Sequence, residues 1–269
     1  MRTHQLLSYL LCRLMKRTLP SLISRKTSFQ SAWNLTQSRM ADRFYTPDFL
    51  APGEYTLTGS EAHHVTAVRR FTPGDNITLF NGDGNEYPAT LLGTGKKSAT
   101  LNILSVLGID RELPFPLVIA SAIPKGDRAD FLIEKLTELG VTRFLPLITE
   151  RSVVHPKEAT LEKFSRAVIE ASKQCGRNRL MTVDPARTWD AVLALSDLPE
   201  SRFVLHTGEG LARMPGRGPT VLAIGPEGGF SPGELERSLA TSWTTVSVGS
   251  RILRVETAAV AAAAILGCQ

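Results

Sequence analysis

The C-terminal part of the chain alternates strand-like and helix-like patterns, and this alternation restricts the fold more than any other feature. Residues 117–122 form a continuous apolar run, as expected of a strand covered on both faces. Apolar residues then recur at helical spacing from Ala129 to Leu139, between a capping Asp127 and Gly140. Further strand patterns lie at residues 141–148, 203–206, 221–225 and 245–248, and further helical patterns at 161–175, 231–240 and 255–266. This alternation predicts an α/β domain with a mostly parallel sheet.

The preceding part of the chain has short strands and frequent turns instead. One segment that alternates apolar and polar residues runs into Asn81-Gly-Asp-Gly, a sequence typical of β-hairpin turns. A short helix is expected over residues 61–69, capped by Ser60. We therefore expect a small β-barrel over residues 42–113 and the α/β domain over residues 114–269.

The first 41 residues differ from the rest in charge. The chain has a net charge of +5, but seven of its 31 basic residues lie in residues 1–41, which contain no acid. The remainder has 24 basic and 26 acidic residues, so any affinity for RNA must come from local basic patches. Residues 1–41 resemble an organellar transit peptide, or else translation starts at Met40. We exclude them from the predicted fold as a disordered extension.

The cysteines and the hydropathy pattern indicate which cellular compartment the protein occupies. Cys12, Cys175 and Cys268 are far apart and lack metal-ligand spacing, which favours free thiols in a reducing compartment over a disulfide framework. No apolar stretch reaches the roughly 18 to 20 residues needed to cross a bilayer. We expect a cytoplasmic protein without a metal, or a mitochondrial or chloroplast protein if the transit peptide is genuine.

Two glycine-containing segments near the C-terminus carry the functional prediction. Gly225-Pro-Glu-Gly-Gly-Phe follows a strand, and Ser231 and Glu234 have capping-box spacing for the next helix. Glycines at a strand end allow the backbone to approach a ligand closely, although a tight turn without a ligand has the same composition. Gly249–Thr257 also leads from a strand into a helix, and it interleaves arginines with Ile and Leu. An ordinary loop with solvated arginines is the alternative for this second segment.

Together and in this order, the two segments resemble the SPOUT methyltransferases, and within them the RsmE family. That family methylates N3 of a uridine in small-subunit (16S) ribosomal RNA. The resemblance extends to Pro124-Lys-Gly-Asp-Arg-Ala-Asp-Phe, Glu150-Arg-Ser-Val-Val and Glu170-Ala-Ser-Lys-Gln-Cys-Gly-Arg, and it covers about residues 40–269.

The resemblance implies a PUA-like RNA-binding β-barrel, a SPOUT α/β domain with a trefoil knot, and a homodimer with each site completed near the interface. The methyl donor is S-adenosylmethionine, which needs no metal. The donor-binding residues implied are Leu205, His206, Gly225, Gly228, Val248, Ile252, Leu253 and Thr257. Arg254 faces the uridine or the RNA phosphates, and we expect it to be the catalytic cation. The general base is not identified, and Glu227 and Glu256 are both candidates.

Local basic residues indicate where RNA could bind. Phosphate contact and helix-end charge are both consistent with the pattern. The predicted RNA-binding residues are Arg69, Arg70, Lys173, Arg177, Arg179 and Arg251. Whether the substrate is naked RNA or an assembled small subunit stays open.

Three other functions were weighed. A nucleotide enzyme is disfavoured because Gly208-Glu-Gly lacks the third Rossmann glycine and Thr94-Gly-Lys-Lys-Ser lacks the first P-loop glycine. A SPOUT enzyme that acts on transfer RNA matches the upstream segments less well. A catalytically inactive RNA-binding protein with the same fold differs in one measurable property, since it does not bind the methyl donor.

Overall fold

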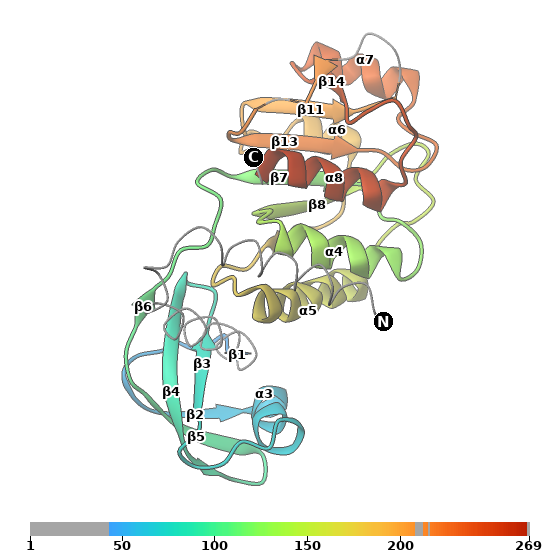
Figure 1. Ribbon diagram of the computed structural model, residues 1–269. Helices are drawn as coiled ribbons and strands as arrows, with labels where there is room; N and C mark the ends of the chain where they lie inside the picture. The colour runs from blue at the N-terminus through green and yellow to red at the C-terminus, as the bar shows by residue number, and fades with distance from the viewer. Residues whose placement is uncertain (1–42, 208–211, 215, 268–269) are drawn as a thin grey trace, which may run out of the picture. The chain divides into compact units, whose positions relative to one another are not determined.

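The structure is a computed structural model that describes residues 43–207, 212–214 and 216–267 (Figure 1). The predicted extension over residues 1–41 and the Gly208-Glu-Gly segment lie outside these residues. Within them, the strands form one six-stranded and one eight-stranded sheet, and both belong to the compact unit that begins at Arg43. The boundary predicted between residues 113 and 114 falls in the linker between the two sheets.

The six-stranded sheet builds the N-terminal β domain. Its strands are β1 (Arg43–Tyr45), β2 (Gly53–Thr58), β3 (Asn76–Phe80), β4 (Asn85–Thr94), β5 (Ser98–Ile103) and β6 (Leu107–Gly108). Their order is β1-β3-β4-β5-β2, with β6 on β4, and only the β1–β3 pair is parallel. Asn81-Gly-Asp-Gly joins β3 to β4 as the predicted antiparallel hairpin. Alternate residues such as Leu57, Leu79 and Leu101 point inward and form the core of this domain.

The one predicted helix of this domain differs from expectation. It consists of α3 (Gly59–His63) followed by a π-helical turn, η2 (His64–Val68). Ser60 lies inside α3 and the N-cap is Thr58, so the predicted Ser60 cap is wrong. The π-helical turn is closed by the Arg69 amide, which donates to the His64 carbonyl at 2.9 Å, five residues earlier.

The eight-stranded sheet confirms the predicted parallel α/β architecture. Its strands are β7 (Leu117–Ser121), β8 (Arg143–Ile148), β9 (Thr182–Val183), β10 (Arg187–Thr188), β11 (Ser201–Leu205), β12 (Ala212–Arg213), β13 (Thr220–Ile224) and β14 (Thr244–Ser247). The order is β10-β8-β7-β13-β11-β14-β12, with β9 on β8, and every pair is parallel. Strands β7 and β13 are buried along their whole length, as expected of strands covered on both faces.

Helices cover both faces of this sheet (Figure 1). They are α4 (Arg128–Glu138), α5 (Glu158–Cys175), α6 (Trp189–Leu193), α7 (Pro232–Ala240) and α8 (Val255–Gly267). One core cluster packs α4, α5 and α8 on the sheet, and another includes Trp189 of α6 and Trp243. Gly176 ends α5 in the left-handed conformation. Asp127 occupies the N-cap of α4, but its side chain makes no capping hydrogen bond.

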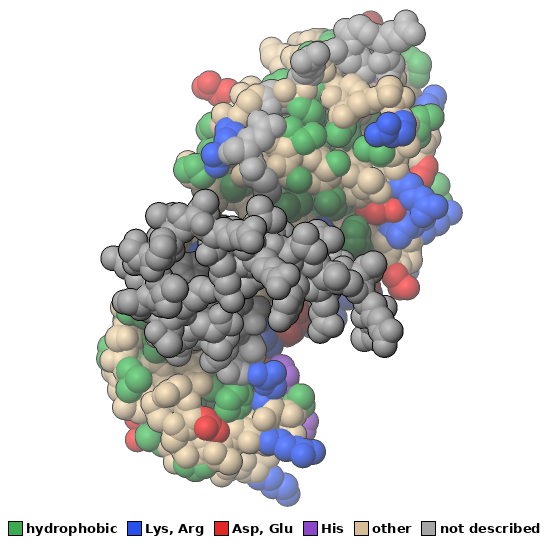
Figure 2. All heavy atoms as spheres, viewed as in Figure 1, with side chains coloured by type: hydrophobic (Ala, Val, Ile, Leu, Met, Phe, Trp, Pro, Cys, Tyr) green, Lys and Arg blue, Asp and Glu red, His purple; other side chains and the backbone are tan. Residues whose placement is uncertain are grey.

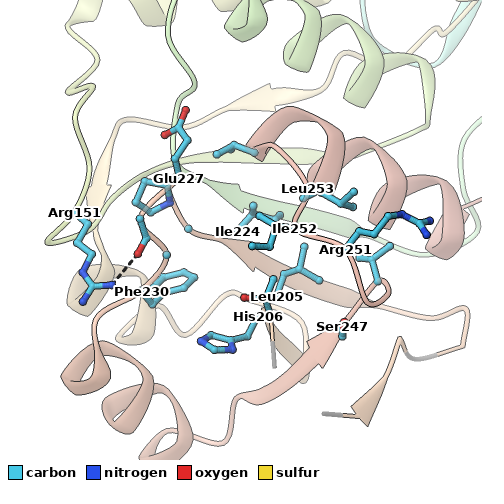
Figure 3. A pocket seen from close by; sticks show the side chains of 18 of the residues that line it. Arg151, Leu205, His206, Ile224, Glu227, Phe230, Ser247, Arg251, Ile252 and Leu253 are labelled. Atoms are coloured by element: carbon cyan, nitrogen blue, oxygen red, sulfur yellow. Dashed lines mark hydrogen bonds between the residues drawn. The ribbon is translucent and has the colours of Figure 1, made fainter. Parts of the chain in front are cut away.

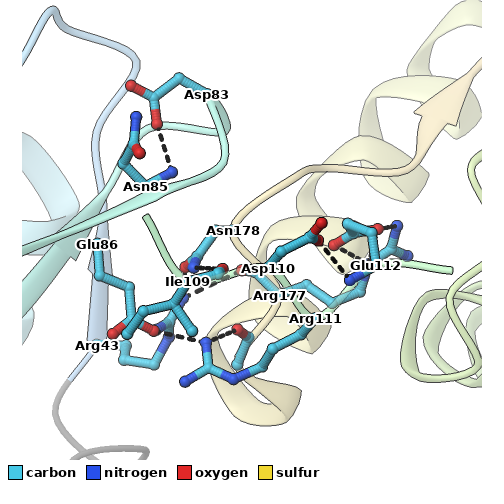
Figure 4. Close-up of polar contacts among 11 residues, drawn as sticks. Arg43, Asp83, Asn85, Glu86, Ile109, Asp110, Arg111, Glu112, Arg177 and Asn178 are labelled. Carbon is cyan, nitrogen blue, oxygen red and sulfur yellow. Dashed lines mark hydrogen bonds and ion pairs between the residues drawn. The ribbon is translucent and has the colours of Figure 1, made fainter. Parts of the chain in front are cut away.

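A buried polar cluster joins the β domain to the segment after α5 (Figure 4). Arg43 forms an ion pair with Glu86, and its Nη2 donates to Asn178 Oδ1 at 2.7 Å. Arg111 Nη1 donates to the same Glu86 carboxylate at 2.6 Å and to the Gly176 carbonyl at 2.8 Å. This cluster ties the two domains together through residues distant in sequence.

No helix among the described residues is long and apolar enough to span a membrane. The trefoil knot that the resemblance implies stays a prediction.

Candidate functional site

A pocket of about 270 Å³ lies where β11, β13 and β14 end, between the two glycine-containing segments (Figure 3). The carboxyl edge of a parallel sheet is the usual place for a ligand in an open α/β fold. Its lining comes from Leu205–Thr207, Ile224–Phe230, Ser247–Gly249 and Arg251–Leu253, with Arg151, Val255 and Ala258. In Figure 3 the side chains of Leu205, Ile224 and Ile252 gather in the middle of the pocket.

The first segment requires glycine for close packing. A Cβ atom on Gly225 would lie 3.0 Å from Cδ2 of Phe230 and 3.3 Å from the carbonyl carbon of Gly229. Phe230 cannot move away easily, because it is 4% exposed and its ring centroid lies 5.0 Å from that of Trp189. Gly229 has a φ of 67°, which lets its amide donate to the Pro226 carbonyl at 2.8 Å. The segment thus folds back on itself, with its backbone facing the pocket.

The helix after this segment begins with the predicted capping box. The Ser231 side chain accepts from the Glu234 amide, and Glu234 Oε2 accepts from the Ser231 amide at 2.8 Å. The other carboxylate oxygen of Glu234 accepts from the Glu150 amide at 2.9 Å. Arg151, the next residue, donates to the Gly228 carbonyl at 2.7 Å. The loop after β8 therefore fixes the glycine segment from the side.

The second segment presents apolar side chains to the pocket. Ile252 is 87% exposed although it lines the cavity, and Leu253 is half-buried. Ser247 Oγ donates to the Gly249 carbonyl at 2.9 Å and closes the turn. An exposed isoleucine beside a concave surface is a suitable wall for a flat apolar ligand group.

Seven of the eight predicted donor-binding residues line this one cavity: Leu205, His206, Gly225, Gly228, Val248, Ile252 and Leu253. Thr257, exposed on α8, is not among the lining residues. Arg254 is also exposed and lies outside the lining, immediately before α8. Binding by all of these residues stays a prediction.

Several lining residues were not predicted individually, among them Arg151 and Phe230. Arg151 could have been noticed because it comes shortly after strand β8, at the same edge of the sheet. Phe230 belongs to the predicted segment, but its contact with Gly225 depends on the backbone path.

Charged groups stand beside the pocket as well as in it. The half-exposed Glu227 side chain points away from the apolar centre in Figure 3, and its Oε1 lies 3.9 Å from Arg128 Nη1. The same nitrogen lies 3.8 Å from Oε1 of Glu256, whose side chain is 7% exposed. Within the described ranges, no group of three or more His, Cys, Asp or Glu residues could hold a metal ion.

The predicted RNA-binding residues divide into two groups. Arg69, Arg70 and Arg179 are exposed, and Arg251 lines the pocket. Where grey atoms do not cover it, the face in Figure 2 carries its Lys and Arg side chains in separate groups. There is thus no single basic stripe on that visible area.

Lys173 and Arg177 do not fit the predicted phosphate contact, because they are only 7% and 4% exposed. Lys173 Nζ donates to Glu61 Oε1 at 2.9 Å, across the domain boundary. Arg177 pairs with Glu112, and its Nη1 donates to the carbonyl oxygens of Thr137 and Val141, each at 2.9 Å. The charges of Lys173 and Arg177 are used in buried contacts within the protein, so these two side chains are not available to RNA phosphates.

Family models match both domains. Residues 57–104 match an RNA methyltransferase PUA domain, and residues 111–267 match an RNA methyltransferase domain. The ribosomal RNA small subunit methyltransferase E of Synechocystis sp. is 31% identical, over 90% of this chain and 79% of its own length. The Bacillus subtilis protein of the same name is also 31% identical, over 76% of this chain and 86% of its own.

Solved structures agree with this match. A ribosomal RNA small subunit methyltransferase E from Neisseria gonorrhoeae, bound to S-adenosyl methionine, is 34% identical with a TM-score of 0.75. The alignment covers 83% of this chain and 95% of that one. A Legionella pneumophila methyltransferase in complex with the same cofactor is 34% identical with a TM-score of 0.78, over 84% and 96% of the two chains. With a PUA-like β domain and a SPOUT domain both matched, the chain belongs to the ribosomal RNA small subunit methyltransferase E family.

Proposed function

We propose that this protein transfers a methyl group from S-adenosylmethionine to N3 of a uridine in small-subunit (16S) ribosomal RNA. The observation that carries the proposal is the pocket at the strand ends, where seven of the eight predicted donor-binding residues come together. Membership in the family supports the substrate class, and a relative with 34% identity contains the donor.

The lining residues match the chemical parts of the donor. Leu205, Ile224 and Ile252 offer apolar surface to an adenine ring, and the glycine segment offers backbone groups at close range. Arg151 supplies positive charge for a carboxylate, and Glu227 supplies negative charge for an ammonium group.

When bound, the donor supplies a methyl group that its sulfonium already activates. The uridine N3–H releases its proton, the N3 electron pair forms a bond to the methyl carbon, and the carbon–sulfur electron pair stays on sulfur. The products are N3-methyluridine, S-adenosylhomocysteine and a proton. The chain's task is to align the base with the methyl group, a contribution of up to roughly 7 to 11 kcal/mol in well-oriented reactions. Arg254 is proposed to favour ionisation of N3 by its positive charge.

RNA contact is assigned to arginines of both domains that are exposed or line the pocket. We propose Arg69, Arg70, Arg179 and Arg251 as phosphate contacts, because they are the exposed or pocket-lining members of the predicted set. Lys173 and Arg177 are left out because they are buried. Neutralising these four arginines should reduce the slope of log RNA affinity against log salt concentration. An unchanged slope would show that they do not contact RNA phosphates.

We also propose that the protein is a homodimer with each site completed near the interface. The family resemblance supports this arrangement. Sedimentation velocity of the purified protein tests it, and a monomer across the working concentration range contradicts it.

The decisive experiment is methylation of small-subunit RNA, both naked and as assembled subunits, followed by nucleoside analysis of the product. We expect N3-methyluridine from one of the two substrates and none from large-subunit RNA. Methylation of a ribose or a guanine would refute uridine N3 as the methylated atom, although the protein would still be a methyltransferase. Calorimetry with S-adenosylmethionine distinguishes a catalytically inactive RNA-binding protein, which gives no binding heat.

A further inference from the structure

The buried carboxylate of Glu256 is the least satisfied charged group beside the pocket. Its Oε2 is inaccessible to solvent and has no hydrogen-bond partner among the described residues. Glu256 lies in the first turn of α8, between Val255 and Ala258, which both line the cavity. The helix N-terminus favours an anion there, but a buried carboxylate oxygen without a hydrogen-bond partner is costly and calls for a functional explanation.

The only charged group that the structure places within 4 Å of this carboxylate, among the described residues, is Arg128. Arg128 opens α4, directly after the segment that follows β7, and its side chain is 36% exposed. Its Nη1 lies 3.8 Å from Glu256 and 3.9 Å from the pocket-lining Glu227, and both separations exceed hydrogen-bond length. Among the described residues, the carboxylates of Glu227 and Glu256 thus attract the Arg128 guanidinium electrostatically, and its N–H donors stay available for hydrogen bonds.

A cation held in this way is suited to charge that develops during a reaction. When N3 of uracil loses its proton, the negative charge is shared with the two carbonyl oxygens that flank N3. A cation that is already positioned before the reaction stabilises such charge without any reorganisation of the protein. This preorganisation is the source of its catalytic effect.

We infer that Arg128 contacts the uracil of the target nucleotide and stabilises its ionised form, and that Glu256 is the positioning residue that holds Arg128 beside the pocket-lining Glu227. The inference rests on the proposed methylation of uridine N3. It gives Glu256 an indirect role, in place of the role as general base considered for it. The N3 proton passes to water, and the chain lowers the cost of losing it.

A double-mutant cycle on the full-length protein tests this assignment. The variants are Arg128→Gln, Glu256→Gln and the double variant, each assayed for kcat, for KM toward small-subunit RNA and for donor affinity by calorimetry. We expect Arg128→Gln to lower kcat by about 100-fold, as for loss of one preorganised charge-stabilising group. Glu256→Gln should lower kcat by at least about 10-fold, because misplacing a reacting group is costly. Donor affinity should stay within about two-fold.

The double variant gives the sharpest result. If Glu256 acts through Arg128, the double variant has the same kcat as Arg128→Gln alone, because the positioned group is already gone. Losses that multiply instead show that Glu256 acts on its own and overturn the positioning role. A raised KM for RNA with unchanged kcat makes Arg128 a phosphate contact and overturns its role toward the base.

Two controls separate these effects from damage to the fold. Asp130→Asn removes a charge from the same helix, where Asp130 pairs with Lys163 at 2.6 Å, and it should leave kcat unchanged. If Glu256→Gln folds poorly in thermal melts, Arg128→Lys replaces it, with an intermediate kcat expected because charge is kept and the planar fork is lost. Wild-type protein that forms no N3-methyluridine overturns the proposed function and this inference together. Active wild type with unaffected variants overturns the inference alone.

Discussion

Single residues decide whether the pocket keeps its shape, and Gly225 is the most restricted of them. A methyl group there would meet the Phe230 ring and the Gly229 backbone at about 3 Å, and neither has space to retreat. We expect Gly225→Ala to weaken binding of S-adenosylmethionine by at least about 10-fold, since displacing this backbone alters the pocket wall. Calorimetry measures the affinity.

Gly233 is the matched control for this substitution. It lies in α7, where an added methyl group would meet only the flexible end of Arg237 at 3.4 Å. Gly233→Ala should therefore stabilise the protein by roughly 0.5 to 1 kcal/mol and leave donor affinity unchanged. Equal losses of affinity in both variants would mean that the close packing at Gly225 has no special importance.

Arg254 allows a second prediction at this scale. Its side chain is exposed and outside the cavity lining, so removing it should not disturb the donor site. We expect Arg254→Ala to lower kcat by about 100-fold while donor affinity stays nearly intact. Single-turnover kinetics and calorimetry give the two quantities. Loss of donor binding would instead make Arg254 a donor-binding residue.

Among the elements, α7 connects local capping to the site. Ser231→Ala should cost about 1 kcal/mol of unfolding free energy, as for loss of an N-cap side chain. Glu234→Ala should cost more, about 2 kcal/mol, because the amides of Ser231 and Glu150 both lose their acceptor. Urea denaturation with unchanged m-values measures both losses. Equal costs for the two variants would show that the bond to Glu150 contributes nothing to stability.

Elements with a long periodic pattern could be predicted from sequence, and short or irregular ones could not. Helix α5 and the buried strand β7 fall close to their expected bounds, because burial imposes a regular period over many residues. The two-residue strands β9 and β10 are too short to carry a period. The π-helical turn η2 has the same apolar spacing as an ordinary helix end. The glycine segments were predicted as one site because their order and their position after strands resemble the SPOUT methyltransferases, whereas each segment alone is also consistent with an ordinary turn.

Contacts between distant residues explain why two predicted site residues lie away from the positions expected of them. Lys173 looked like a phosphate ligand because its partner Glu61 is 112 residues away and belongs to the other domain. Thr257 is the last residue of the second glycine-containing segment, but the first turn of α8 directs it to solvent. A sequence gives the residue types in a segment, whereas the direction of each side chain depends on the packed structure.

For the whole molecule, the connection between the two domains depends on a buried charge cluster. Burial opposes ionisation of Glu86, but hydrogen bonds and charge from Arg111 and Arg43 outweigh it and lower the pKa of Glu86 below its ordinary value of 4.5. The turn between β3 and β4 adds an uncharged contact between the domains, since the Gly84 amide donates to the Asn178 carbonyl at 3.1 Å. The domains are therefore joined more strongly when Glu86 is ionised.

The lowered pKa fixes the direction of a pH effect. An acid whose pKa is lower in the folded protein stabilises the fold above its unfolded pKa, and this contribution disappears as pH falls through the folded value. Glu86→Gln leaves Arg43 buried without its anion and should cost roughly 3 to 5 kcal/mol at neutral pH. The difference from wild type should shrink progressively below about pH 4.5. Denaturant unfolding across the pH range measures it, with the exposed Glu54→Gln as a control that should match wild type throughout. A cost that persists unchanged in acid would show that Glu86 contributes by its shape and not by its charge.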